Sequence, residues 1–256
     1  MIECAIDSHV ATITLANPPA NTFTAEGLLR LAVLVDELNR DLDVHAVIVT
    51  GQGDKFFSGG ADLKLFADGD KVRARLMAQR FGAAFEALQN ARPVVIAAIN
   101  GYAMGGGLEC ALACDFRVAD ERAALALPEP AVGLLPCAGG TQALPWLVGE
   151  GWAKRMILTN ERVDAATALR IGLVEQVTAA GGALAAASEL ASRVLALSPR
   201  AVASCKTLIH EARNGTPRGA ALVKERELFV DLFDGADQLE GVSAFLEKRK
   251  PRWTNG

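Results

Sequence analysis

The sequence of 256 residues predicts an α/β fold with a mostly parallel sheet. The first observation is that residues 46–50, which are apolar except for Thr50, and the continuous apolar run 94–99 have strand length, as is typical of strands covered on both faces. The second is that a stretch with helical periodicity precedes each run. Strands that alternate with helices in this way favour parallel pairing, because the chain returns to the same edge before each new strand.

The first half of the chain supplies the strands and helices of this prediction. Residues 2–16 alternate as two short strands that meet near Asp7 and Ser8, and the sequence Asn-Pro-Pro-Ala-Asn at 17–21 then forces a loop. Thr24 can cap a helix, whose apolar positions are Leu28, Leu31, Leu34, Val35 and Leu38. After the strand at 46–50 we expect a loop at 51–68, a helix at 72–89 and the strand at 94–99.

A third unit follows, and the chain then becomes mostly helical. We expect a helix at 107–113, a strand at 116–119 and a short segment at 123–127. Further helices are predicted at 141–147, 152–158, 165–171, 184–197, 200–213, 220–232 and 237–248. No proline-rich or serine-rich linker separates the two parts. The core comprises residues 1–195 and the helical region comprises residues 196–256. Because no linker separates them, we expect the helical region to pack on the core or on a neighbouring subunit.

Composition excludes several classes of function. The net charge is −4 without a basic run, so neither nucleic acid nor a membrane surface is an expected partner. The apolar stretch 93–113 contains Glu109 and several glycines and is not expected to span a membrane. Five cysteines without framework spacing, and no leader segment, predict reduced thiols in the cytoplasm. Cys110 and Cys114 lack a second ligand pair, so no metal is expected.

Two glycine-rich turns are the first candidates for chemistry. One spans residues 56–64 and contains Gly59 and Gly60, and the other spans 100–109 and contains three consecutive glycines before a helix. If the turns face each other, their unpaired N–H groups would stabilise a negative oxygen. The alternative is that the glycines only permit tight turns. Neither turn is a phosphate loop, because Gly-Lys-Ser/Thr is missing.

Two glutamates are the second candidates. Glu109 falls in the first turn of the helix after the glycines, where the helix dipole should favour its ionised form. Glu129 is the one charge in the apolar stretch 124–135, so burial should raise its pKa. Carboxyl groups in contrasting environments can act as base and acid in one site. The alternative readings are a helix-terminal charge for Glu109 and an exposed turn residue for Glu129.

A nucleophilic mechanism is not favoured. No Gly-x-Ser-x-Gly elbow occurs, and Ser58 and Cys137 have no histidine near them in sequence that could activate them.

Three segments together resemble the crotonase (enoyl-CoA hydratase/isomerase) family. They are residues 57–64, residues 100–109 and the stretch from Pro128-Glu129 to Ala138-Gly139-Gly140-Thr141-Gln142. The resemblance covers essentially the whole chain. It implies a spiral core of ββα units, a C-terminal helical trimerisation region, and a homotrimer or a homohexamer built as a dimer of trimers.

The resemblance also implies an activity and its residues. It implies reversible hydration of a trans-2-enoyl-CoA to a 3-hydroxyacyl-CoA. The backbone N–H groups of Ala61 and Gly106 would form the oxyanion hole, Glu109 would activate water, and Glu129 would protonate C2. Coenzyme A is then part of the substrate, and no cofactor is implied. The residues implied to contact the substrate are Pro19, Ala20, Asp62, Leu63, Lys64, Cys137, Phe245 and Lys248, the last two reaching the ligand of a neighbouring subunit.

Two positions depart from the family pattern. Cys137 stands where glycine is usual, and Ala143 stands where arginine commonly follows Thr-Gln. The side chain of Cys137 is expected to narrow the pocket, to favour a particular acyl group or to weaken activity. Three alternatives to a hydratase stay open: a double-bond isomerase, a retro-Claisen or decarboxylating enzyme, and a non-catalytic protein that binds acyl-CoA or associates with RNA.

Overall fold

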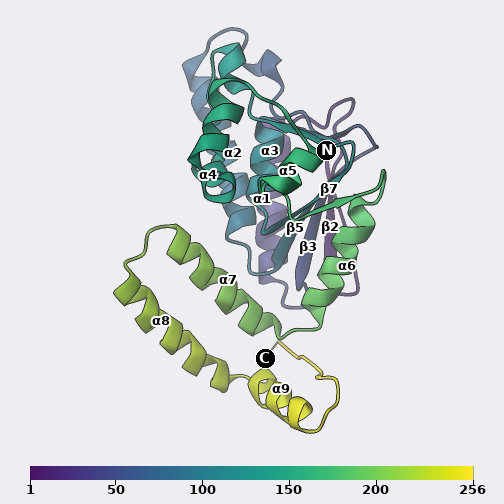
Figure 1. Cartoon of the computed structure of the whole chain (residues 1–256), viewed down its shortest axis with the longest axis vertical. Coiled ribbons are helices and arrows are strands. Elements are labelled where there is room, and N and C mark those ends of the chain that lie inside the picture. Colours follow the sequence, from purple (N-terminus) through teal and green to yellow (C-terminus); the bar gives the residue numbers. More distant parts are fainter. Residues whose placement is uncertain (256) are drawn as a thin grey trace.

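The computed structural model describes residues 1–255, and its centre is a six-stranded sheet in the order β1-β2-β3-β5-β7-β10 (Figure 1). Only β1 is antiparallel to its neighbour. The parallel prediction is therefore confirmed, and so is the N-terminal hairpin. The strands are β1 (Ile2–Asp7), β2 (Val10–Leu15), β3 (Ala46–Gly51), β5 (Val94–Ile99), β7 (Phe116–Asp120) and β10 (Gln176–Thr178).

A second sheet of four short strands is the part of the fold that the sequence pattern did not predict. Its strands are β4 (Phe56–Ser58), β6 (Tyr102–Met104), β8 (Ala124–Ala126) and β9 (Val163–Asp164). The first three run parallel. Strands of three residues among glycines are too short to produce a recognisable alternation. Each of β4, β6 and β8 follows a strand of the large sheet, so the ββα unit expected from the crotonase resemblance is present.

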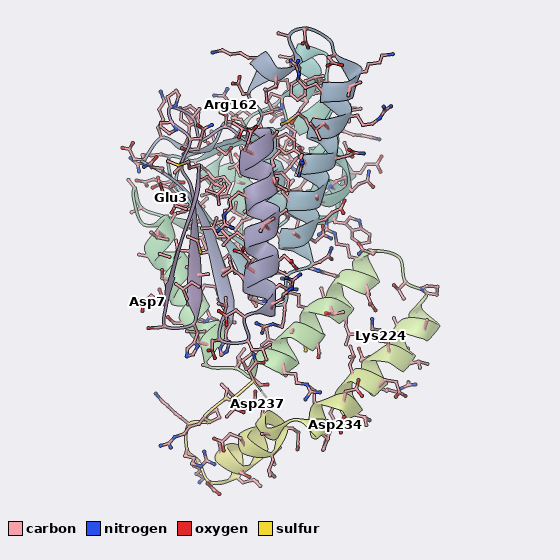
Figure 2. All side chains as sticks on the ribbon, turned by 180° about the vertical axis from the view of Figure 1, so that it is seen from behind. Glu3, Asp7, Arg162, Lys224, Asp234 and Asp237 are labelled. Carbon is pink, nitrogen blue, oxygen red and sulfur yellow. The ribbon has the colours of Figure 1, made fainter. Side chains whose placement is uncertain are left out.

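Helices cover both faces of the large sheet. Figure 2 shows α1 (Ala25–Arg40) and α2 (Lys71–Gln89) side by side over one face, where they share a core with α3 (Gly106–Leu112). The opposite face is covered by α6 (Ala183–Leu195). The predicted cap of α1 is confirmed, since Thr24 Oγ1 accepts a hydrogen bond of 3.0 Å from Gly27 N.

The two helices predicted at 141–147 and 152–158 form one segment, α4 (Gly140–Leu158), with a break inside it. Gly149 has φ 77° and ψ 159°, which is outside the helical region and is open to glycine without strain. The short α5 (Ala165–Arg170) follows β9.

The last three helices lead away from the core (Figure 1), and they are α7 (Pro199–Arg213), α8 (Arg218–Asp231) and α9 (Ala236–Leu246). The buried Lys206 of α7 attaches them, since its Nζ donates to Pro93 O at 3.0 Å and pairs with Asp115 at 2.6 Å. Lys224 of α8 pairs with Glu211 of α7 (Figure 2). The division between residues 195 and 196 stays a prediction, and Gly256 lies outside the described residues.

No helix in the described part of the chain is long and apolar enough to cross a membrane.

Candidate active site

The candidate site lies where three neighbouring parallel strands of the small sheet end. Ala61 follows β4, Gly106 follows β6, and Glu129 follows β8. Loops that follow the carboxyl ends of parallel strands meet at one edge of the sheet, which is where α/β proteins place their ligands. The short strands that sequence patterns missed are therefore the elements that bring the predicted residues together.

The two glycine-rich turns face each other at very short range. A Cβ atom at Gly60 would stand 2.6 Å from Met104 O and 3.0 Å from Gly106 N. Gly60 also has φ +84°, a conformation that side chains rarely adopt. Only glycine therefore allows these two backbones to approach so closely. This close approach confirms the expectation that the two turns face each other.

Two N–H groups in these turns are candidate donors to a bound anion. Gly60 O accepts a hydrogen bond of 2.8 Å from Phe23 N. The Ala61 N–H belongs to the same trans peptide unit as this carbonyl, so it points away from Phe23. Gly106 begins α3, where the first N–H groups have no partner within the helix.

Ser58 and Asn21 hold the first turn in place. Ser58 is fully buried; its Oγ donates to Asn21 O at 2.8 Å and accepts from Gly60 N at 3.1 Å. Asn21 Nδ2 donates to Phe56 O at 2.9 Å. These two side chains were not predicted as site residues. Ser58 has a structural role here, in agreement with the view that it is no nucleophile.

Glu109 is 3% exposed and is held by backbone alone. Its Oε1 accepts hydrogen bonds from Ala138 N at 2.8 Å and Gly140 N at 2.9 Å, so the carboxylate sits at the N-terminus of α4. Burial raises the pKa of Glu109, and the two hydrogen bonds lower it by less. The prediction that the dipole of its own helix would favour ionisation is wrong in direction, because desolvation outweighs the donors.

Glu129 begins the 3-10 helix η2 (Glu129–Val132) and is half-buried. Burial, and secondarily the charge of Glu109, raise the pKa of Glu129 from 4.5 to about 7. This confirms the predicted direction and its cause. Among the described residues, Glu129 Oε2 is the only buried side-chain oxygen or nitrogen without a hydrogen-bond partner.

These groups line one apolar cavity of about 570 Å³. Its walls contain Ala61, Gly106, Glu109 and Glu129 together with Leu63 and Cys137 of the predicted contact residues. The two glutamates are its only charged residues, and the rest of the wall includes Phe66, Ala74, Ala78, Phe81, Val132, Leu134 and Leu135. We call this space the apolar cavity.

Cys137 lies at the edge of the apolar cavity near both glutamates. Burial, then the charges of Glu109 and Glu129, raise the pKa of its thiol to about 11, so the thiol is neutral near pH 7. A neutral thiol is a poor nucleophile, in keeping with the sequence argument.

The remaining predicted contact residues lie outside the apolar cavity. Ala20 touches its rim, since Ala20 O accepts from Gly59 N at 2.7 Å. Pro19 and Lys64 are exposed, and Asp62 caps the 3-10 helix η1 (Leu63–Phe66) through Lys64 N at 3.1 Å. Phe245 is 83% exposed at the end of α9, and Lys248 follows it, both in the helical region rather than at the cavity.

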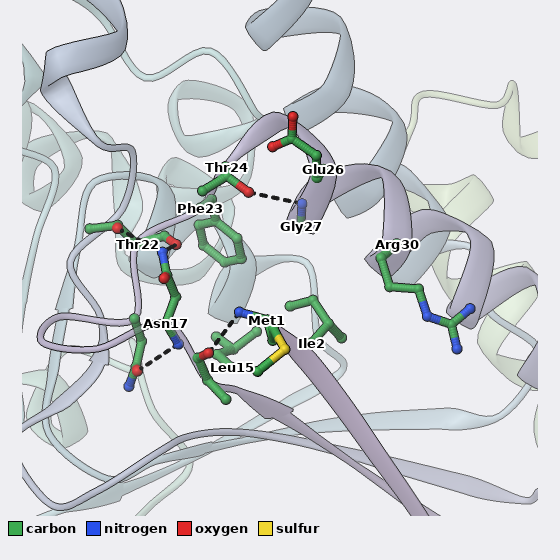
Figure 3. A pocket seen from close by; sticks show the side chains of 12 residues that line it. Met1, Ile2, Leu15, Asn17, Thr22, Phe23, Thr24, Glu26, Gly27 and Arg30 are labelled. Carbon is green, nitrogen blue, oxygen red and sulfur yellow. Dashed lines mark hydrogen bonds between the residues drawn. The ribbon is translucent and has the colours of Figure 1, made fainter.

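A second hollow of about 400 Å³ lies between the N-terminus, β2 and the start of α1 (Figure 3). Asn17, Thr22, Glu26 and Arg30 are on its wall. The Met1 amino group donates to Ala16 O at 2.6 Å beside it. This hollow contains neither a glycine-rich turn nor either candidate glutamate, and we do not assign the chemistry to it.

Comparison with known proteins gives similarities over nearly the whole chain. Residues 5–256 match the family model described as enoyl-CoA hydratase/isomerase. The solved structure of DspI from Pseudomonas aeruginosa is 64% identical with a TM-score of 0.96, covering 98% of this chain and 96% of that one. A solved enoyl-CoA hydratase from Bacillus anthracis is 36% identical with a TM-score of 0.95, covering 100% of this chain and 99% of that one.

A short-chain-enoyl-CoA hydratase from Clostridium acetobutylicum is 36% identical over 95% of this chain and 94% of its own length. The match to the family model and these similarities extend over nearly the full chain, including every segment of the candidate site. The chain therefore belongs to the enoyl-CoA hydratase/isomerase family.

Proposed function

We propose that this protein is an enoyl-CoA hydratase, a hydro-lyase that adds water reversibly across the 2,3 double bond of a trans-2-enoyl-CoA to give a 3-hydroxyacyl-CoA. The observation that carries the proposal is the contrast between two carboxyl groups on one apolar cavity. Glu109 accepts two backbone hydrogen bonds, whereas Glu129 has an unpaired oxygen and a pKa of about 7. Groups that differ in this way can divide base and acid chemistry between them.

The thioester oxygen binds between Ala61 N–H and Gly106 N–H in this proposal. Addition to C3 moves negative charge onto that oxygen as an enolate, and fixed N–H donors stabilise the charge without rearrangement. The close approach of Gly60 and Gly106 supports this role, because Ala61 N–H belongs to the peptide unit that begins at Gly60. Ser58 and Asn21 act as positioning residues for the first donor.

Glu109 and Glu129 hold the reacting water between them. Glu109 orients the water and accepts its proton as the oxygen bonds to C3. Glu129 delivers a proton to C2, which its raised pKa permits near pH 7. Proton transfer from Glu109 back to Glu129 then restores the site, so the net change is one water added. The chemistry requires no cofactor besides the coenzyme A of the substrate.

The acyl chain occupies the apolar cavity, whose walls contain no charge other than the two glutamates. The coenzyme A part runs along Pro19, Ala20 and residues 61–64, and Cys137 limits the acyl end.

The exposed apolar side chains of the C-terminal helices support assembly into a trimer or a dimer of trimers, in which Phe245 and Lys248 reach a neighbour's ligand. They include Phe229, Val230, Phe233, Phe245 and Leu246. A cytoplasmic location stays a prediction, and five free cysteines suit a reducing compartment.

Double-bond isomerisation is the second candidate. The unpaired Glu129 Oε2 favours it specifically, because one carboxyl group can move a proton between C2 and C4 of an enolate without a water molecule. Isomerisation leaves the substrate mass unchanged, whereas hydration adds one water, so mass analysis of the product separates the two reactions.

The test is an assay of the purified protein with trans-2-enoyl-CoAs of short, medium, long and branched chains. Hydration removes the ultraviolet absorbance of the conjugated thioester, and we expect that loss with at least one substrate. Glu129→Gln should bind acyl-CoA and lose turnover by about a hundredfold or more, the scale of general acid catalysis. No loss of absorbance with any of these substrates would reject the proposal, and equal turnover in the variant would reject the role of Glu129.

A further inference from the structure

A second cavity of about 530 Å³ lies on the other side of Glu109. It is enclosed by α2, the end of α3, the start of α4 and the loop that follows α7. Its walls contain the polar side chains Glu86, Gln89, Gln142, Arg213 and Asn214, and we call it the polar cavity. The exposed residues Glu86, Gln142 and Asn214 give it an opening to solvent.

Glu109 and Cys137 are the only residues shared by the walls of the apolar and polar cavities. The buried residue Glu109 therefore lies on the walls of two unlike spaces. Its Oε1 is used by Ala138 N and Gly140 N. Its Oε2 accepts no hydrogen bond from the described residues and is accessible to solvent.

Water needs a separate route to the site once an acyl-CoA fills the apolar cavity. Apolar walls and a bound acyl chain exclude solvent, yet every hydration consumes a water whose oxygen bonds to C3. A water molecule inside a protein needs about two to four polar partners. The polar cavity has polar side chains along its wall between the solvent and Glu109, and these can bind water. In the apolar cavity only the two glutamates and backbone groups can do so.

We propose that the polar cavity is the route by which water reaches and leaves Glu109 while an acyl thioester occupies the apolar cavity, with Cys137 as the residue that separates the two spaces. The inference rests on the proposed hydratase function. In it, Ala143 becomes a specificity feature of this chain, because a small side chain at this buried position keeps the route open.

The experiment uses isotopes in the dehydration direction. A 3-hydroxyacyl-CoA labelled with heavy oxygen at C3 is incubated with the whole protein in deuterated water. In each cycle of dehydration and rehydration, the C2 proton taken up by Glu129 is exchanged for deuterium by proton transfer along hydrogen-bonded groups, which does not require a water molecule to leave. The oxygen at C3 is exchanged only if the released water escapes. The ratio of oxygen loss to deuterium gain is independent of the folded fraction, since both exchanges need the same active molecules.

Two variants restrict the polar cavity. Ala143→Leu fills it from within, and Gln142→Trp narrows it at an exposed position where folding is less at risk. We expect the ratio to fall about tenfold or more in at least one variant, which corresponds to about 1.4 kcal/mol on the escape step. Ala78→Leu narrows the apolar cavity instead, and it should raise KM for long acyl chains without changing the ratio.

An unchanged ratio in both variants would overturn the proposal. It would also be overturned if Ala143→Leu removed activity toward long acyl chains alone, because the polar cavity would then hold the end of the acyl chain. If the wild-type protein hydrates none of the enoyl-CoAs, the proposed function fails first, and that result is separate from either outcome.

Discussion

The Glu129 carboxyl group lies against Gly105 so closely that a Cβ atom at residue 105 would stand 2.8 Å from Glu129 Oε1. Gly105 also has φ +54° and ψ −125°, and it immediately precedes Gly106. The first of the three consecutive glycines in the second turn therefore fixes the place of the carboxyl group that follows β8. A link of this kind between two distant segments is not visible in the sequence.

The first prediction concerns Gly105→Ala. The new methyl group should displace the Glu129 carboxyl group and lower kcat by about a hundredfold, since small displacements of catalytic groups have effects of this size. Steady-state kinetics with the best enoyl-CoA measures the change. Gly53→Ala is the matched control, because Gly53 has φ +81° and nothing within 4 Å of a Cβ atom. It should lose some stability and keep its kcat, and an equal loss in both variants would attribute the effect to backbone strain.

The second prediction is the pH dependence of the reaction. Hydration needs a proton on Glu129, whose pKa is about 7, so the hydration rate should fall about tenfold per pH unit above that value. Dehydration starts from the same singly protonated pair, with the proton on Glu109, so its rate should fall in parallel, because the equilibrium constant of a water addition does not depend on pH. Rates in both directions between pH 5 and 9 test this. Hydration that stays constant up to pH 9 would show that Glu129 is not the acid.

The third prediction links Glu129 to stability. Its pKa is 4.5 in the reference state and about 7 in the folded protein, so ionisation opposes folding. The stability associated with protonated Glu129 is present below pH 4.5 and is lost as pH rises through about 7. Glu129→Gln should therefore be more stable than wild type at pH 8, with little difference at pH 4.5. Each kcal/mol by which ionised Glu129 lowers the free energy of unfolding corresponds to about 2–4 °C in Tm.

Thermal unfolding at the two pH values tests this expectation. The matched control is Glu189→Gln, which removes the same charge at an exposed position of α6. A gain in Tm that is the same at both pH values, or that appears equally in the control, would contradict the assignment.

The fourth prediction separates two roles of Glu109. Glu109→Ala leaves the N–H groups of Ala138 and Gly140 without their acceptor, at a cost of about 1–3 kcal/mol for each buried group. Glu109→Gln keeps an acceptor oxygen and should retain most of the stability. Both variants should lose hydratase activity. Urea unfolding and kinetics together test this, and equal stability of the two variants would mean that the hydrogen bonds do not hold the start of α4.

The large sheet was predictable because its signal is strong and local. The runs at 46–50 and 94–99 are buried, have strand length and are apolar except for Thr50, and the helices beside them have a clear apolar face. The small sheet was not predictable in this way. Its strands have two or three residues each, and pairing between distant segments forms them.

The same contrast applies to the candidate site. The raised pKa of Glu129 could be predicted because the apolar sequence around it also surrounds it in space. The direction in which the pKa of Glu109 shifts could not be predicted from the helix that carries it. The donors that hold it come from Ala138 and Gly140, and the surfaces that bury it come from other elements. Cys137 was singled out as a departure, but its place between two cavities depends on the folded chain.

The central claim is that the glutamates of the apolar cavity add water to an enoyl-CoA. The most direct measurement is mass analysis of the product formed from a trans-2-enoyl-CoA in water labelled with heavy oxygen. The account predicts a 3-hydroxyacyl-CoA that contains the heavy oxygen at C3, formed by the wild-type protein and suppressed in Glu129→Gln. Unchanged substrate, or an isomer of unchanged mass, would contradict it.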